Sequence, residues 1–271
     1  MMQDTDLARR GLALLGCGKM GSAMLAGWLA RGLPADSVRV QDPNPSDWLQ
    51  AQGVHINAGF GNSPAVVLIA VKPQMMGEAL PALQDLPKGD TLFVSVAAGT
   101  PITTYEAHLG DVPIVRAMPN TPAAVGKGIT AIIGNARTTD AHLKTAEDLL
   151  SAVGEVVRLE DESQMDAVTG VSGSGPAYVF HMIECLAKAG EAEGLAPELA
   201  MALARATVAG AGALAQETGE DPAQLRRNVT SPNGTTQAGL EVLMNEDDGL
   251  PPLMRATVAA AARRSKELAN G

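Results

Sequence analysis

Three glycines near the amino terminus have the spacing of a phosphate-binding turn. Gly16, Gly18 and Gly21 follow the apolar run 12–15 and lead into 22–32, where apolar residues recur at helical spacing. In such a unit the first glycine permits a tight turn, the second lets a diphosphate approach, and the third lets helix and strand pack closely. The helix start adds free N–H groups and a positive dipole end. The spacing predicts a dinucleotide site; the alternative is an ordinary glycine turn.

An acidic residue ends the next predicted strand. Apolar and polar residues alternate in 36–42, and the segment finishes at Asp42. A dinucleotide fold places a ribose-binding acid about 20 residues beyond the glycine turn, where Asp42 lies. A carboxylate there accepts hydrogen bonds from the ribose and repels a 2′-phosphate, which favours NAD. Asp before Pro43 is also ordinary turn chemistry, and that alternative stays open.

Two turns rich in Ser, Thr and Gly interrupt the second half of the chain. They are 169–176 (TGVSGSGP) and 230–236 (TSPNGTT), and each leads into a predicted helix. Hydroxyls and N–H groups at a helix start can bind a small anion. Ser and Thr also cap helices routinely, which is the alternative for either turn alone. Two such turns together favour a site for a small carboxylate.

The glycine turn and Asp42 must be positioned by strands of a sheet. The continuous apolar run 65–71 is typical of a parallel strand covered on both faces. Further strands are expected at 91–97, 113–119, 129–134 and 155–159. A helix is expected at 139–153, closed by Gly154. Strands alternating with helices indicate a doubly wound sheet over 1–160. Ligands bind at the carboxyl ends of such strands.

Alanine-rich helical periodicity replaces the strand pattern beyond 159–162. We therefore predict an α/β Rossmann-like dinucleotide-binding domain over 1–160 and an all-α domain over 161–271. Small residues in 200–215 indicate closely packed helices. Apolar positions on more than one helical face imply more buried surface than a lone helical domain would hide. We expect an obligate dimer through 163–271.

The composition narrows the class of protein. The 271 residues include 20 basic and 30 acidic side chains, a net charge of −10, which argues against nucleic-acid and anionic-membrane surfaces. Apolar runs such as 65–71 are far shorter than the ~20 residues that span a bilayer. The amino terminus has no secretory signal pattern. Cys17 and Cys185 form no disulfide framework, and the four histidines are scattered. We expect a cytoplasmic protein without a metal site.

Taken together, the motifs resemble pyrroline-5-carboxylate reductase. The resemblance runs nearly end to end and is carried, besides the glycine turn, by AVKP at 70–73, VAAG at 96–99, RAMPNTP at 116–122, AVTGVSGSGPAYVF at 167–180 and VTSPNGTTQAG at 229–239. It implies reduction of (S)-1-pyrroline-5-carboxylate to L-proline, the last step of proline biosynthesis, with NADPH or NADH. It also implies a Rossmann-like domain, a helical C-terminal domain that forms a homodimer, and in some members a ring of dimers.

Two positions depart from the family pattern. The family's SP-G-G turn has Asn233 in place of its first glycine, and Asn tolerates left-handed backbone better than other non-glycine residues. Gln41-Asp42-Pro43 lacks the Asn-Arg pair of some members. The second departure bears on the preference between NADPH and NADH and leaves the reaction unchanged.

The resemblance also implies site residues. The cofactor set is Gly16, Cys17, Gly18, Lys19, Met20 and Gly21 at the diphosphate, Asp42 and Asn57 toward the adenosine, and Ala70, Val71, Lys72, Pro73, Ala97, Ala98 and Gly99 at the nicotinamide. The substrate carboxylate is expected at Ser231, Gly234, Thr235 and Thr236, with Ser174 and Gly175 nearby. Thr236 is the expected catalytic residue, through a hydrogen bond from its hydroxyl to the ring nitrogen.

Hydride transfer to a cyclic C=N bond fits a site without an obvious acid–base constellation. A protonated imine is already electrophilic, so the protein has chiefly to position the reactants, with the hydride coming from the cofactor. A related reductase of another cyclic imine or a 2-hydroxy acid is one alternative; the latter would need a Lys or His base, and Lys188 lies too deep in its helix. A non-catalytic dinucleotide sensor is the other.

Overall fold

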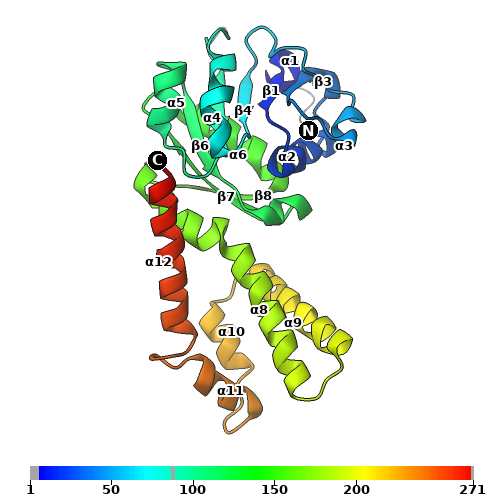
Figure 1. The fold of residues 1–271 in the computed structure, drawn as a ribbon, viewed down its shortest axis with the longest axis vertical. Coiled ribbons are helices and arrows are strands. Elements are labelled where there is room, and N and C mark those ends of the chain that lie inside the picture. The colour runs from blue at the N-terminus through cyan, green and yellow to red at the C-terminus, as the bar shows by residue number, and fades with distance from the viewer. Residues whose placement is uncertain (1–5, 87–88, 270–271) are drawn as a thin grey trace. The chain divides into compact units, whose positions relative to one another are not determined.

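The computed structural model describes residues 6–86 and 89–269. The chain forms two compact units, Met1–Gly173 with Ala261–Gly271, and Ser174–Ala260. The first is a sheet covered by helices and the second consists of helices, which confirms the predicted fold class (Figure 1). The assignment of 1–160 to dinucleotide binding and of 161–271 to substrate binding and dimerisation stays a prediction.

The first unit contains one eight-stranded sheet with the order β3-β2-β1-β4-β5-β6-β7-β8. Its strands are β1 Leu12–Leu15, β2 Val38–Gln41, β3 His55–Ile56, β4 Val66–Ile69, β5 Leu92–Ser95, β6 Ile114–Met118, β7 Gly128–Gly134 and β8 Gly154–Arg158. In the central register, Leu12 pairs with Val38 on one side and with Val66 on the other. All pairs are parallel except β6 with β7.

The antiparallel pairing of β7 follows from the length of its connection. Only residues 119–127, which include a short helical turn at Thr121–Val125, lie between β6 and β7. A parallel return needs a crossover of about a dozen residues or more, so the chain reverses direction instead. Strand β8 can again run parallel to β7 because helix α6 (Asp140–Leu150) forms the crossover.

Two hydrophobic clusters cover the two faces of the sheet. Leu12 and Leu14 point into one, with α2 (Lys19–Ala30) and α6; Ala13 and Leu15 point into the other, with α4 (Met76–Ala79) and α5 (Ile102–Leu109). Trp28 of α2 is fully buried and its indole N–H donates to the Leu149 carbonyl oxygen at 2.8 Å. Burial on both faces explains why the central strands β1 and β4 are apolar at every position.

The helical elements beyond the sheet are α7 Met165–Val168, a π-helical turn at Thr169–Gly173, α8 Gly175–Ala192, α9 Pro197–Thr218, α10 Pro222–Asn228, α11 Thr235–Leu243 and α12 Leu250–Ala269. Helices α8 and α9 lie side by side (Figure 1). Small residues allow this approach, since a Cβ on Gly190 would lie 3.4 Å from the Cβ of Ala200. Two short helices, α1 (Asp6–Arg10) and α3 (Asp47–Gln50), complete the first unit.

Large apolar side chains of the helical unit are exposed in the single chain. They include Phe180, Met182, Leu186, Leu199, Leu203 and Leu214. Helix α9 is also long and apolar enough to cross a membrane, with a mean hydropathy of 1.2. A search for uninterrupted runs of large apolar residues does not find α9, because most of its apolar residues are alanines spread along the helix. Core helices of soluble proteins pass the same test.

The end of α12 returns to the first unit. The buried Ser265 hydroxyl donates to Oδ1 of Asp166 at 2.7 Å. Beyond it, the Leu268 side chain lies over Gly99, whose added Cβ would come within 3.3 Å of the Leu268 Cβ. The carboxyl-terminal helix thus packs on the loop that follows β5.

Candidate active site

The three glycines of the turn are required for different reasons. Gly16 has φ +87°, and an added Cβ would lie 2.8 Å from Cγ1 of Val71. At Gly21 an added Cβ would lie 2.7 Å from the Gly16 carbonyl oxygen. At Gly18 it would meet no protein atom within 4 Å. The first and third are therefore demanded by the packing of the protein itself, whereas Gly18 faces open space that a bound diphosphate could occupy.

Helix α2 begins at this turn without a side-chain cap. Gly18 is the N-cap residue, and within α2, all of whose residues are described, the first turn contains no acidic side chain. The first N–H groups of a helix have no partner within it. Lys19 at the helix start is exposed and Met20 is half-buried. The uncapped N–H groups and the helix dipole favour an anion next to Gly18; that a diphosphate binds there stays a prediction.

The segment 70–73 lies beside the glycine turn. The Ala70 N–H donates to the Leu15 carbonyl oxygen at 2.8 Å, and Val71 contacts Gly16. Strands β1 and β4 are neighbours, but the chain leaves them toward opposite edges of the sheet. Such a switch point opens a crevice at the carboxyl ends of the strands, where ligands bind. Lys72 is exposed there, and Pro73 begins a short helical turn.

The Asp42 carboxylate is joined directly to the glycine turn. Its Oδ2 accepts a hydrogen bond from the Cys17 N–H at 2.7 Å, and its Oδ1 accepts one from the Asn44 N–H at 2.8 Å. Each carboxylate oxygen has a second acceptor position, which leaves capacity for ribose hydroxyls. Burial, and to a smaller extent the Asp42 charge, raises the pKa of the Cys17 thiol to about 12. Cys17 is therefore a neutral packing group in the turn.

Asn57 holds the backbone of Asp42. Its Oδ1 accepts from the Asp42 N–H at 3.0 Å and its Nδ2 donates to the Asp42 carbonyl oxygen at 2.9 Å. The left-handed backbone of Asn57, with φ +53°, is one that Asn tolerates. Both the oxygen and the nitrogen of the Asn57 side-chain amide bind the Asp42 backbone, so in this structure Asn57 supports the position of Asp42. Its contact with the adenosine stays a prediction.

A buried tyrosine supports the loop 96–100. The Tyr105 hydroxyl lies 2.5 Å from the Ser95 hydroxyl, which accepts from the Ala97 N–H at 3.3 Å. Burial raises the pKa of Tyr105, against the opposing effect of its hydrogen bonds to Ser95 and Thr100. Above this support, Ala98 is half-buried and Gly99 takes φ +70°. The predicted nicotinamide loop is thus held by Tyr105 on one side and by Leu268 on the other.

Glu162 ties the start of α5 to the centre of the sheet. Its Oε1 accepts from the Ile102 N–H at 2.9 Å and from the buried Arg116 guanidinium at 2.6 Å. Pro101, the N-cap residue of α5, offers no side-chain acceptor, so Glu162 supplies it. Sequence reasoning missed Tyr105, Glu162 and the role of Arg116. An arginine within an apolar strand was the available signal, because a buried guanidinium needs an acidic partner.

Two of the family-like motifs meet in the first unit. The Asn120 amide donates to the Ser172 hydroxyl at 3.3 Å, and its oxygen accepts from the Ile129 N–H at 3.0 Å. Gly173 lies against the Met118 side chain, because a Cβ added there would meet the Met118 Cε. The end of β6 therefore packs against the π-helical turn Thr169–Gly173, and π-helical turns are frequent at functional sites.

The predicted carboxylate turn in the helical unit also leads into an uncapped helix. Gly234 is the N-cap residue of α11 and provides no side chain. Asn233, with φ +59°, donates its N–H to the Gln237 side-chain oxygen at 2.8 Å. Thr235 and Thr236 are exposed, and their hydroxyls form no hydrogen bond with any residue that the structure describes. Neither threonine caps α11, so both hydroxyls are available to a ligand.

Ser174 and Gly175 form the start of α8, and Ser231 lies in the turn before α11. Ser174 is the N-cap residue of α8 but makes no side-chain cap, and Gly175 is the first helical residue. Ser231 is exposed, and its carbonyl oxygen accepts from the Gly234 N–H at 3.0 Å. Within the described part of the helical unit, no hydrogen bond joins the two turns. Their common use for one substrate stays a prediction.

Comparisons with known proteins agree with this arrangement. A family model described as pyrroline-5-carboxylate reductase dimerisation matches residues 162–268, and one described as NADP oxidoreductase coenzyme F420-dependent matches residues 11–99. The pyrroline-5-carboxylate reductase of Pseudomonas aeruginosa is 41% identical over 95% of this chain and 96% of its own length.

Solved structures are similar over the same length. A pyrroline-5-carboxylate reductase from Coxiella burnetii has a TM-score of 0.88 at 35% identity, covering 96% of this chain and 98% of its own. The pyrroline carboxylate reductase of Plasmodium falciparum, solved with NADP bound, has a TM-score of 0.83 at 27% identity, covering 97% and 99%. Identity and coverage of this order, together with the glycine turn and the uncapped α11 turn, place the chain: it belongs to the pyrroline-5-carboxylate reductase family.

Proposed function

We propose that this protein reduces (S)-1-pyrroline-5-carboxylate to L-proline in proline biosynthesis, with NADPH or NADH as the cofactor. The observation that carries the proposal is the start of α11, where the Thr235 and Thr236 hydroxyls lie free beside an uncapped helix N-terminus. Similarity over nearly the whole chain to reductases of this name, at 41% identity in one of them, supports the substrate. The open space at Gly18 and the uncapped start of α2 support the dinucleotide.

The residues divide the work between binding and orientation. N–H groups at the start of α11 bind the substrate carboxylate with Ser231, Gly234 and Thr235, and Ser174 and Gly175 complete that site. The Thr236 hydroxyl forms a hydrogen bond with the ring nitrogen, which orients the C=N bond while the charge on the nitrogen changes. The nicotinamide, when bound, supplies the hydride. Loops 70–73 and 97–99 hold its ring, and the packing of Leu268 and Tyr105 supports the second of these loops.

Asp42 is the proposed determinant of cofactor preference. Its carboxylate is joined to the glycine turn and has free acceptor positions for the ribose diol. The same negative charge disfavours a 2′-phosphate, so we expect NADH to be used more efficiently than NADPH.

A homodimer through the helical domain covers the apolar faces that a single chain leaves exposed. The family model that matches residues 162–268 is one of dimerisation. We assign the exposed faces of α8 and α9 to this interface, so that a second copy, and no bilayer, covers α9 in a cytoplasmic protein. Further assembly into a ring of dimers is part of the proposal. Light scattering at micromolar concentration should give a dimer or a multiple of it; a fully active monomer would contradict this assignment.

The direct test follows NADH or NADPH absorbance after addition of pyrroline-5-carboxylate and identifies the product as L-proline. We expect turnover with this imine, and loss of most of it in Thr236→Val. Turnover only with other cyclic imines or with 2-hydroxy acids would move the protein to a related reductase activity. Cofactor binding without turnover of any of these substrates would make it a dinucleotide sensor.

A further inference from the structure

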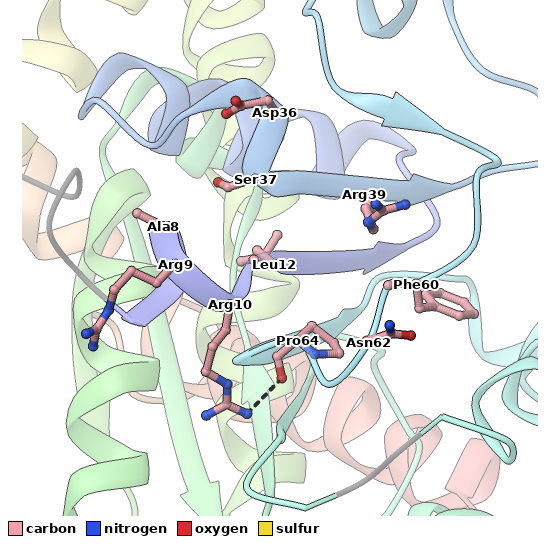
Figure 2. A pocket seen from close by; sticks show the side chains of 12 residues that line it. Ala8, Arg9, Arg10, Leu12, Asp36, Ser37, Arg39, Phe60, Asn62 and Pro64 are labelled. Atoms are coloured by element: carbon pink, nitrogen blue, oxygen red, sulfur yellow. Dashed lines mark hydrogen bonds between the residues drawn. The ribbon is translucent and has the colours of Figure 1, made fainter.

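A second cavity lies at the opposite end of the sheet from the glycine turn. It has a volume of about 300 Å³ and is formed where α1 ends and where β1, β2 and β4 begin (Figure 2). Strand β1 separates the two places, and its four residues span roughly 13 Å. The cavity is therefore distinct from the proposed dinucleotide site, and nothing in the proposed reaction uses it.

Three arginines line this cavity: Arg9, Arg10 and Arg39. Arg9 and Arg10 share one acidic partner, Asp6, at 3.5 Å and 3.1 Å, and Arg10 also donates to the Ser63 and Pro64 carbonyl oxygens at 3.4 Å and 3.3 Å. Arg39 is half-buried and donates to the Ala58 carbonyl oxygen at 3.2 Å, but no described carboxylate pairs with it. Three arginines along one cavity stand out in a chain with a net charge of −10.

Asp36 is the acidic residue in the lining, and it does not neutralise the arginines. No described ion pair joins Asp36 to any of them. In Figure 2 its carboxylate lies apart from the Arg9, Arg10 and Arg39 guanidinium groups. A partly desolvated guanidinium without a carboxylate partner favours the binding of an anion.

The loop 57–63 forms one wall and adds unused donors. Positive φ angles occur at alternate residues, namely Asn57, Gly59, Gly61 and Ser63. Successive N–H groups in such a turn can point toward one bound anion. The N–H groups of Phe60, Gly61 and Asn62, which line the cavity, donate to no acceptor among the described residues, and neither does the Asn62 amide.

Gly61 leaves room for the Arg39 side chain, which also donates to the Ala58 carbonyl oxygen of the same loop. With φ +79° its backbone runs against the arginine, and an added Cβ would come within 2.9 Å of Nε. The loop therefore holds the guanidinium at the cavity in place of leaving it free in solvent. A held guanidinium binds a tetrahedral oxyanion through two parallel hydrogen bonds and loses little entropy in doing so.

We infer that this cavity binds the phosphate group of a small molecule. The Arg39 guanidinium, which has no described carboxylate partner, and a row of N–H donors match a dianion with three or four acceptor oxygens better than they match a single carboxylate. The volume lies at the small end of ligand pockets, which suits a phosphate group with a small organic part. Phe60, half-buried at the wall, provides an apolar surface for that part.

Isothermal titration calorimetry tests the site on the full chain with the dinucleotide site saturated by NADH. The probes are inorganic phosphate, glycerol 3-phosphate and, for comparison, acetate, at equal ionic strength. We expect saturable binding of both phosphate compounds and none of acetate. Tighter binding of glycerol 3-phosphate would identify a phosphate ester as the ligand, and equal affinity would identify free phosphate; both results support the site.

Three variants decide whether the cavity is responsible. Arg39→Gln should weaken phosphate binding by about tenfold or more, since it removes charge-assisted hydrogen bonds. Asn62→Asp, at an exposed loop position, places a carboxylate in the cavity and should do the same without risk to folding. Arg137→Gln, an exposed arginine paired with Asp111 elsewhere in the unit, is the matched control and should bind like the wild type. Absence of saturable phosphate binding, equal binding by Asn62→Asp, or preference for acetate would overturn the inference.

Discussion

The Asp42 carboxylate accepts a hydrogen bond from the Cys17 N–H, so the acid at the end of β2 is part of the glycine turn at the end of β1. Asn57 fixes the same residue from the other side through two hydrogen bonds to its peptide groups. A change at Asp42 should therefore act on cofactor choice and on the shape of the turn together.

Replacing Asp42 by Asn separates these two effects. Asparagine keeps one side-chain acceptor but removes the charge that repels a 2′-phosphate. We expect the ratio of kcat/KM for NADPH to that for NADH to rise about tenfold, as expected for a lost ionic repulsion of ~1.4 kcal/mol. Asp42→Ala removes both acceptors as well and should lower the free energy of unfolding by about 1–2 kcal/mol. An unchanged cofactor ratio in Asp42→Asn would remove this residue from the specificity determinants.

Two glycine substitutions should separate folding from cofactor binding. Gly18 has φ −69°, which any residue adopts, and a Cβ there meets no protein atom. Gly18→Ala should keep the wild-type Tm and raise the cofactor KM about tenfold or more, because the methyl group occupies the diphosphate position.

Gly16→Ala is the matched control for that experiment. The positive φ and the overlap with Val71 make it destabilising by about 1–3 kcal/mol. Thermal melting and steady-state kinetics on both variants provide the comparison. A Gly18→Ala variant that melts early with unaltered cofactor KM would contradict the assignment of that space to a ligand.

The Cys17 thiol should make stability depend on alkaline pH. Its pKa is raised from 9.0 to about 12, so the folded protein holds the proton more tightly than the unfolded chain. The resulting stabilisation is complete below about pH 9 and is lost as the pH rises toward 12. Cys17→Ala does not titrate there and should lose less stability between pH 8 and pH 10 in urea unfolding, both pH values being approximate. Equal losses in the two proteins would contradict the buried, neutral thiol.

Glu162→Gln should destabilise the first unit. The amide can still accept from the Ile102 N–H, but the buried Arg116 guanidinium loses its negative partner. The Glu162 side chain is 30% exposed, which weakens the effect relative to a fully buried pair, so we expect a loss of about 1–3 kcal/mol. Urea unfolding measures it, with Glu267→Gln, at the exposed ion pair to Arg264, as the control. A loss no larger than the control's would show that Arg116 does not depend on Glu162.

The strands of the first unit could be predicted because the sheet is covered on both faces. The run 65–71 is apolar at every position, and 91–97 is apolar except at the buried Thr91 and Ser95, a pattern typical of strands in the interior of a parallel sheet. The two-residue strand β3 has no such pattern, since His55 is exposed and Ile56 half-buried. The antiparallel direction of β7 was visible only in the shortness of the connection 119–127.

The supports of the site could not be predicted, because they join residues far apart in the sequence. Glu162 reaches the start of α5, and Leu268 reaches Gly99, through packing that no local periodicity encodes. The turn at 230–236 was predicted to enter a helix. The N-cap position is occupied by Gly234 and by neither threonine. Only the backbone could decide this, because Ser, Thr, Asn and Gly are all favourable N-cap residues.

The kinetics of Thr236→Val with pyrroline-5-carboxylate test the account most directly. The Thr236 hydroxyl caps no helix in this structure, so the substitution should change the free energy of unfolding by less than ~0.5 kcal/mol. If the hydroxyl acts on the ring nitrogen, kcat and kcat/KM should fall together by roughly 10- to 100-fold at unaltered cofactor affinity. Thr236→Ser, which keeps the hydroxyl, should stay near the wild-type rate. A Thr236→Val variant that turns over pyrroline-5-carboxylate at the wild-type rate would contradict the central claim.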